Sequence, residues 1–169
     1  MKKPKAPPKK KVAIIMGSKT DLKVMQAAAD VLKEFGIPYH LEVVSAHRTP
    51  EKMFEFARLA HERFSLIIAG AGGAAHLPGM VACLTTLPVI GVPVQLGSLK
   101  GMDALLSVVQ MPKGIPVATV AIDNAANAGL LAARFVGMND EKIQKKLQKY
   151  QSSQKKKVAQ MNREIRLAR

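Results

Sequence analysis

The 169-residue chain is long enough for one domain with a sizeable core, and its single cysteine excludes an internal disulfide and a cysteine-rich metal site. A net charge of +14 at pH 7 is typical of nucleic-acid-binding proteins, but here the charge lies at the two ends of the chain. Residues 1–11 carry six lysines and residues 141–169 carry ten basic side chains against two acids, whereas residues 12–140 carry ten of each. The chain also has only two tyrosines and five phenylalanines for stacking on bases, so we expect no nucleic-acid partner.

The amino-terminal segment and the lengths of the apolar runs bear on the cellular compartment of the protein. Residues 1–11 form a Lys-Pro tract without an apolar segment or a helical pattern, which predicts a disordered basic tail and not a secretion signal. No apolar stretch is long enough to cross a bilayer, so we expect no membrane partner. The reducing cytoplasm is the expected compartment, and the apolar neighbours of Cys83 predict a buried thiol.

Apolar strands alternate with amphipathic helices through residues 12–138, which we predict to be one catalytic domain. The strands are expected at 12–16, 39–44, 66–69, 89–92 and 117–121, and the helices are expected to begin near Asp21, Pro50, Leu77, Asp103 and Ala125. Continuous Val, Ile and Ala runs indicate strands that are covered on both faces. The predicted fold is therefore a three-layer α/β fold with a doubly wound parallel sheet, of the flavodoxin- or Rossmann-like kind.

Residues 139–169 are predicted to form a separate helical extension. Asn139-Asp140-Glu141 is a good helix start, and apolar side chains then recur at spacings of three and four, at Ile143, Leu147, Tyr150, Val158, Met161 and Ile165. A narrow apolar stripe with charged flanks is typical of a helix that packs on a neighbouring subunit. The same periodicity also fits a helix that packs on its own domain, and the sequence leaves both interpretations open.

The first predicted strand ends in Gly17-Ser18-Lys19-Thr20-Asp21, before a helical pattern. Gly17 allows a sharp turn, Ser18 can cap the helix, and the free amides of the first helical turn attract anions. The segment matches neither the dinucleotide-binding glycine pattern nor the Walker lysine pattern. Ser18 and Asp21 are also consistent with a purely structural helix cap, so this loop alone does not identify a site.

The second predicted strand is followed by Ser45-Ala46-His47-Arg48-Thr49-Pro50, the most informative stretch of the chain. A histidine titrates near neutrality and can give and take a proton, and an adjacent arginine offers a fork of donors to a phosphate or carboxylate. This combination favours catalysis on a phosphorylated substrate. The alternative is a surface turn, because Thr-Pro also opens a helix well.

A glycine-rich segment, residues 70–79, follows the third predicted strand and ends near His76 and Leu77. Residues this small let backbone amides approach a flat polar ring, although close packing of a helix on a strand favours the same residues. His76 is equally consistent with a structural histidine. Because ligands bind beyond the carboxyl ends of parallel strands, we expect the three segments to meet at one rim of the sheet.

These motifs resemble the family of bacterial N5-carboxyaminoimidazole ribonucleotide mutases of purine biosynthesis. The resemblance rests on Ser-Ala-His-Arg-Thr-Pro at 45–50, the segment 16–21, and Ala-Gly-Ala-Gly-Gly-Ala-Ala-His-Leu-Pro-Gly-Met at 69–80. The segments 88–94, 109–117 and 127–132 also resemble that family, and together the motifs span about residues 12–136. Several long motifs in the same order are far more specific than any one glycine pattern.

The resemblance implies a reaction without metal or cofactor, in which a carboxylate moves from the exocyclic nitrogen of an imidazole ribonucleotide to a ring carbon. It implies that His47 transfers the proton as acid and then as base, and that His76 and Leu77 contact the carboxylate end. The remaining substrate-binding residues are implied to be Ser18, Ser45 and Arg48 at the phosphate, Asp21 at the ribose, and the backbone of Ala71, Gly72 and Gly73 beside the ring.

The family also implies a homo-oligomer, an octamer, whose only other partner is the small-molecule ribonucleotide. Two other functions are compatible with the motifs. One is an aminoimidazole ribonucleotide carboxylase that uses free carbon dioxide, although Arg48 favours the mutase because lysine takes that place in the carboxylase branch. The other is a non-catalytic ribonucleotide-binding protein, which would keep Ser18, Asp21 and Arg48 but has no need of His47.

Overall fold

Five parallel strands form one sheet in the order β2-β1-β3-β4-β5 in the computed structural model, which describes residues 10–168. Ile14 at the middle of β1 pairs with Leu41 on one side and with Ile68 on the other. This order confirms the predicted doubly wound, flavodoxin-like sheet. The strands are β1 Lys11–Met16, β2 Tyr39–Val43, β3 Phe64–Gly72, β4 Val89–Val94 and β5 Ala118–Thr119.

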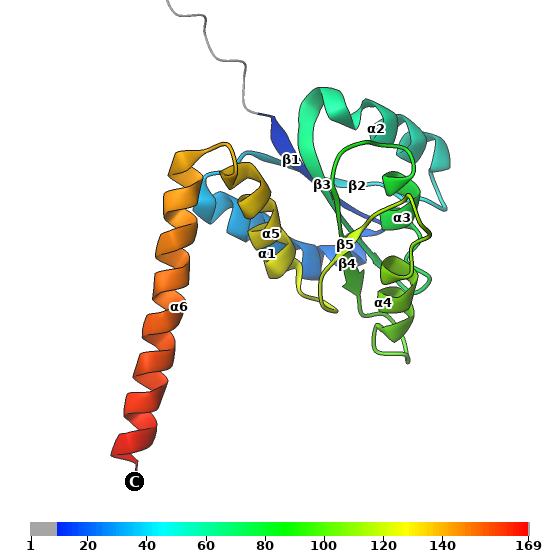
Figure 1. The fold of residues 1–169 in the computed structure, drawn as a ribbon. Helices are drawn as coiled ribbons and strands as arrows, with labels where there is room; N and C mark the ends of the chain where they lie inside the picture. Colours follow the sequence, from blue (N-terminus) through cyan, green and yellow to red (C-terminus); the bar gives the residue numbers. More distant parts are fainter. Residues whose placement is uncertain (1–9, 169) are drawn as a thin grey trace, which may run out of the picture. The chain divides into compact units, whose positions relative to one another are not determined.

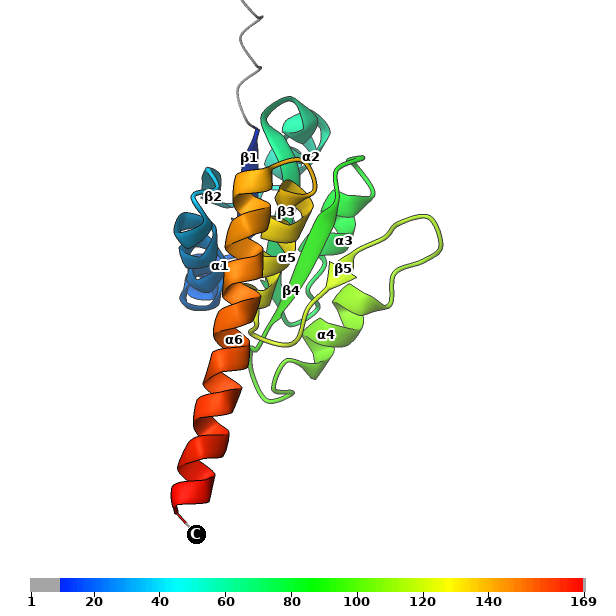
Figure 2. The same ribbon diagram turned by 60° about the vertical axis from the view of Figure 1, so that its left-hand side comes forward.

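Helices cover both faces of the sheet, as the apolar runs predicted. Figures 1 and 2 show α2, α3 and α4 on one face, and α1 with the first turns of α5 on the other. Residues 12–16 of β1 are completely buried between these layers. The helices are α1 Leu22–Phe35, α2 Pro50–Arg63, α3 Leu77–Ala82, α4 Met102–Val109, α5 Ala125–Gly137 and α6 Glu141–Leu167, and a short 3-10 helix, η1 Lys19–Asp21, precedes α1.

The strands β3 and β5 differ most in length from their predicted spans. β3 continues through Gly70-Ala71-Gly72 because these residues still pair with Val92, Pro93 and Val94 of β4, although their small side chains predict a loop. β5 contains two residues instead of the expected five, and it pairs only with β4 at the edge of the sheet. The longer β3 carries the start of the glycine-rich segment out to the rim of the sheet.

Cys83 is exposed, so the prediction of a buried thiol is wrong. The residue follows the last residue of the short helix α3, where its Sγ donates a hydrogen bond to the carbonyl of Met80 at 3.0 Å. Apolar neighbours in sequence did not imply burial because the chain leaves the helix at this point.

Helix α6 begins as predicted, with Asp140 as its N-cap and the backbone N–H of Lys142 donating to Asp140 Oδ1 at 3.0 Å. Ile143 and Leu147 are 6% and 9% exposed, and they meet Gly137 at the end of α5. Of the two interpretations left open, packing on the same chain therefore holds for these two residues. Val158, Met161 and Ile165 in the second half of α6 remain more than half exposed.

The chain divides into two compact units within α5, after Ala132. The predicted tail falls mostly on residues 1–9, which lie outside the described residues, and Lys11 at its end already belongs to β1. Within residues 10–168, no helix combines the length and the apolar character that a membrane crossing requires.

Candidate active site

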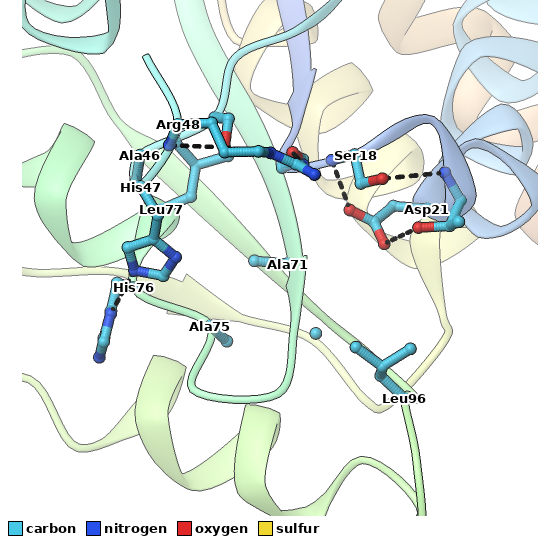
Figure 3. A pocket seen from close by; sticks show the side chains of 14 residues that line it. Ser18, Asp21, Ala46, His47, Arg48, Ala71, Ala75, His76, Leu77 and Leu96 are labelled. Carbon is cyan, nitrogen blue, oxygen red and sulfur yellow. Dashed lines mark hydrogen bonds between the residues drawn. The ribbon is translucent and has the colours of Figure 1, made fainter. Parts of the chain in front are cut away.

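A cavity of about 410 Å³ lies where the loops after β1, β2, β3 and β4 leave the sheet. Figure 3 shows side chains from these four loops around it. Nine of the ten predicted site residues line this cavity, which is the convergence expected of parallel strands, and only Gly73 does not. The lining residues are Gly17, Ser18, Thr20, Asp21, Ser45, Ala46, His47, Arg48, Ala71, Gly72, Ala75, His76, Leu77 and Leu96.

The loop after β1 holds Asp21 almost fully buried, at 6% exposure. The backbone N–H of Ser18 donates to Asp21 Oδ2 at 3.0 Å, and the hydroxyl of Thr20 donates to Asp21 Oδ1 at 3.4 Å. The N–H of Thr20 in turn donates to Ser18 Oγ at 3.4 Å. Ser18 and Asp21 therefore do cap η1, as the structural interpretation proposed, while both also line the cavity.

Burial raises the pKa of Asp21 above its ordinary value, and this effect outweighs the hydrogen bonds from Ser18 and Thr20 and the positive charge of Arg48, which lower the pKa. The charged form of Asp21 therefore lowers the free energy of unfolding relative to the neutral form. A helix cap alone does not require a carboxylate that is buried in this way. A buried carboxylate that faces a cavity is a candidate to accept hydrogen bonds from ligand hydroxyl groups.

Arg48 joins the first two loops. Its Nη2 donates to the carbonyl oxygen of Gly17 at 2.6 Å, and its Nε and its backbone N–H both donate to Ser45 Oγ at 3.2 Å. Ser45 is 9% exposed, and Thr49 Oγ1 donates to its carbonyl oxygen at 3.1 Å, which fixes the turn. These bonds fix the plane of the guanidinium and leave the rest of its N–H groups available at the cavity for an anion.

His47 and His76 form a pair across the loops after β2 and β3. His47 Nε2 lies 2.7 Å from His76 Nδ1, and the two rings meet edge to face with centroids 4.9 Å apart. Figure 3 shows this contact at one end of the cavity. One nitrogen must donate the shared proton and the other must accept it, so the two rings cannot both be fully protonated while the bond exists. The geometry therefore places a proton donor and a proton acceptor side by side at this end of the cavity.

The end of β3 forms the middle of the cavity wall from backbone and small side chains. A Cβ on Gly72 would lie 2.9 Å from the carbonyl oxygen of Val94, so this position must be glycine for the strand to pass so close to β4. Gly73 and Ala75 both have positive φ values, of 63° and 37°, as the chain turns back toward His76. A flat ring can lie directly against this stretch of main chain.

Five lining residues are absent from the predicted site: Gly17, Thr20, Ala46, Ala75 and Leu96. The first four are neighbours in sequence of predicted residues, so the predicted loops already contained them. Leu96 comes from the loop after β4, a segment without charged, histidine or hydroxyl neighbours before Ser98 to mark it. Its place four residues after the end of the predicted parallel strand 89–92 is the one signal that pointed to it.

Residues 11–157 match the family model described as AIR carboxylase. The chain belongs to the AIR carboxylase family. It is 60% identical over 148 residues to an N5-carboxyaminoimidazole ribonucleotide mutase of Pyrococcus horikoshii, a match that covers 87% of this chain and 84% of that protein. It is 57% identical over 148 residues to the chloroplastic phosphoribosylaminoimidazole carboxylase of Vigna aconitifolia, covering 87% of this chain and 27% of the plant protein.

A solved structure of Treponema denticola PurE superimposes on this AIR carboxylase family member with a TM-score of 0.82 and 32% identity, over 90% of this chain and 96% of that one. The family resemblance inferred from the motifs is thereby confirmed. The family match also extends past the expected limit near residue 136 and includes the first half of α6.

Asp21→Asn tests whether the buried charge is kept at the expense of stability. A raised pKa means that folding favours the neutral carboxyl, so its stabilising effect is present at low pH and is lost as the pH rises through the pKa of the folded state. We expect the neutral amide to raise the free energy of unfolding at pH 7, by an amount that shrinks as the pH is lowered and the wild-type carboxyl is protonated.

Denaturant titrations at a series of pH values measure this effect, with Asp30→Asn as the control because Asp30 is an exposed acid on α1. The control should change the free energy of unfolding little at any pH. If Asp21→Asn lowers the free energy of unfolding at pH 7, the charge stabilises the fold and its proposed functional role loses this support.

Proposed function

We propose that this protein interconverts N5-carboxyaminoimidazole ribonucleotide and 4-carboxy-5-aminoimidazole ribonucleotide, a mutase step of de novo purine (IMP) biosynthesis, in the cytoplasm. One observation carries the proposal: a chain 60% identical to a protein named as that mutase has a histidine pair, an arginine and a buried carboxylate around one cavity. The substrate has a phosphate, a ribose, a flat ring and a carboxylate, and the cavity offers a matching group for each.

Arg48, Ser45 and Ser18 are proposed to bind the phosphate. The guanidinium of Arg48 is already oriented by Gly17 and Ser45, so little conformational entropy is lost when an anion binds its remaining N–H groups. The two serine hydroxyls line the same part of the cavity and can donate to phosphate oxygens. Asp21, which adjoins this group, is proposed to accept hydrogen bonds from the ribose hydroxyls.

The imidazole is proposed to lie against the backbone of Ala71 and Gly72, which line the cavity, whereas Gly73 does not. The carboxylate end of the ligand is then proposed to point toward His47, His76 and Leu77. Leu77 is 2% exposed and adds an apolar surface at this end of the cavity. An apolar surface beside the reacting carboxylate favours the uncharged carbon dioxide that forms during the reaction.

His47 is proposed to transfer the proton in both halves of the reaction. Protonated His47 gives its proton to the exocyclic nitrogen as the N–C bond breaks and carbon dioxide leaves. The ring carbon of the substrate then attacks carbon dioxide. The neutral side chain of His47 removes the proton from that carbon, which returns His47 to its protonated starting form. His76, 2.7 Å away, is proposed to hold His47 in place and to share its proton between the two steps.

Isotope retention tests the proposed reaction. With substrate labelled at the carbamate carbon and an excess of unlabelled bicarbonate, a mutase that keeps carbon dioxide in its cavity should give product that retains most of the label. Mass spectrometry of the product at early turnover measures the retained fraction. Complete loss of the label would instead support a carboxylase that uses free carbon dioxide.

The substitution His47→Asn tests the proposed proton transfer. We expect turnover to fall by roughly a hundredfold or more, because proton transfer by a positioned group contributes on that order. Binding of the carboxylated product, measured by calorimetry, should change little. His61→Asn is the matched control, since His61 is an exposed histidine in the last turn of α2. Equal turnover of the two variants would remove His47 from the mechanism, whereas a wild type that binds the product without any turnover would favour a non-catalytic ribonucleotide-binding protein.

We further propose that the chain assembles as a homo-octamer. Met102, Leu106 and Val109 on α4 are each about half exposed and recur at helical spacing, which supports contact with a second copy more directly than the buried Ile143 and Leu147 do. Light scattering at physiological salt should give a mass of about eight chains. A monodisperse monomer would overturn this assignment without affecting the proposed chemistry.

A further inference from the structure

Leu96 is an apolar side chain in the wall of the cavity. It is 57% exposed, and it lines the cavity from the loop after β4. A Cβ placed on Gly72 would lie 3.0 Å from Leu96 Cβ, so the leucine stands directly against the stretch of main chain where a flat ring fits. In the view of Figure 3, Leu96 lies on the far side of Ala71 and Ala75 from the histidine pair.

The loop that carries Leu96 has a fixed backbone path. Gly97, Lys100 and Gly101 all have positive φ values, of 67°, 51° and 85°, which indicates a series of tight reversals. A Cβ on Gly101 would lie 2.6 Å from Ile122 Cγ2, so the end of the loop packs closely on the segment after β5. The loop is therefore attached at its carboxyl end to a second segment of the chain.

Asp123 attaches the amino end of the same loop. The backbone N–H of Gln95, the residue before Leu96, donates to Asp123 Oδ1 at 2.8 Å. The N–H of Asp123 donates to the carbonyl oxygen of Pro93 in β4 at 2.9 Å. Asp123 itself has a φ of 56°, a left-handed conformation that costs free energy in most residues and that Asp and Asn tolerate best. The carboxylate thus fixes the direction in which the chain leaves β4.

We propose that Leu96 is a ligand-contact residue that packs on the ring and ribose of the bound ribonucleotide, and that Asp123 is the positioning residue that holds it there. This inference rests on the proposed function, since it takes the ligand to be a ribonucleotide. When the ring lies on Gly72, the exposed leucine side chain is covered, and removal of its apolar surface from water stabilises the complex. The phosphate end, held by Arg48, does not reach this contact.

Leu96→Ala tests the proposed contact. We expect the KM for the carboxylated product to rise about tenfold with kcat changed less than about twofold, because a contact made equally in the ground state and the transition state affects binding alone. Leu99→Ala is the matched control, since Leu99 is 61% exposed in the same loop but does not line the cavity. Its KM should equal that of the wild type.

Two substitutions at Asp123 test the positioning role. Asp123→Ala removes the acceptor for Gln95 and should raise KM by about as much as Leu96→Ala, with little further effect when the two changes are combined. Asp123→Asn keeps an acceptor and tolerates the left-handed backbone, so it should restore the wild-type KM. Thermal unfolding of each variant monitors stability, and rescue of KM by Asn is the result that a general loss of stability does not produce.

The outcomes separate failure of this inference from failure of the proposed function. A wild-type protein that does not turn over the carboxylated product contradicts the proposed function. An active wild type with equal KM values for Leu96→Ala and Leu99→Ala overturns the contact. If Leu96→Ala instead lowers the mass in light scattering and leaves KM unchanged, Leu96 is a contact between subunits and the inference is wrong.

Discussion

The parallel direction of β2, β1, β3 and β4 is the constraint on which the site depends. Because neighbouring strands run the same way and are paired in register, their carboxyl ends meet at one edge, and every loop that follows a strand begins there. Segments separated by many residues, such as Asp21, His47 and His76, become neighbours without any interaction between them having to bring them together. The burial of β1 and β3 between two layers of helices keeps that edge rigid.

The loops at this edge contain groups that a fold selected only for stability has no need of. Asp21 is buried with a raised pKa, and Arg48 bonds to a carbonyl and a hydroxyl, not to a carboxylate that would neutralise it. His47 and His76 are hydrogen-bonded to each other at the surface of the cavity. By contrast, Glu42 on the edge strand β2 is bonded to His40 and Lys52, and these partners lower its pKa in the way an ordinary structural ion pair does. The difference between Glu42 and Asp21 supports the proposal that Asp21 has a role in ligand binding, whereas Glu42 has the environment of a structural carboxylate.

Much of the fold and of the cavity could be predicted because the signals are local. The apolar runs at 12–16 and 66–69 identified buried strands, and Ser45 to Pro50 marked a loop with chemistry. What was missed depends on contacts across the chain. The small residues at the end of β3 resemble a loop in sequence, but they pair with β4 and extend the strand. Leu96 reaches the cavity because Asp123 directs its loop. Ile143 is covered by the end of α5. The roles of the site residues remain predictions.

A crystal structure of the protein with 4-carboxy-5-aminoimidazole ribonucleotide bound tests the central claim most directly. The account predicts one ligand per chain in the cavity at the carboxyl edge of the sheet, with the phosphate on Arg48 and Ser45, the ribose hydroxyls on Asp21, and the ring against Gly72. The carboxylate should then lie within hydrogen-bond distance of His47 or His76. A ligand bound elsewhere, or bound in this cavity with its phosphate at the histidine pair, would contradict the account.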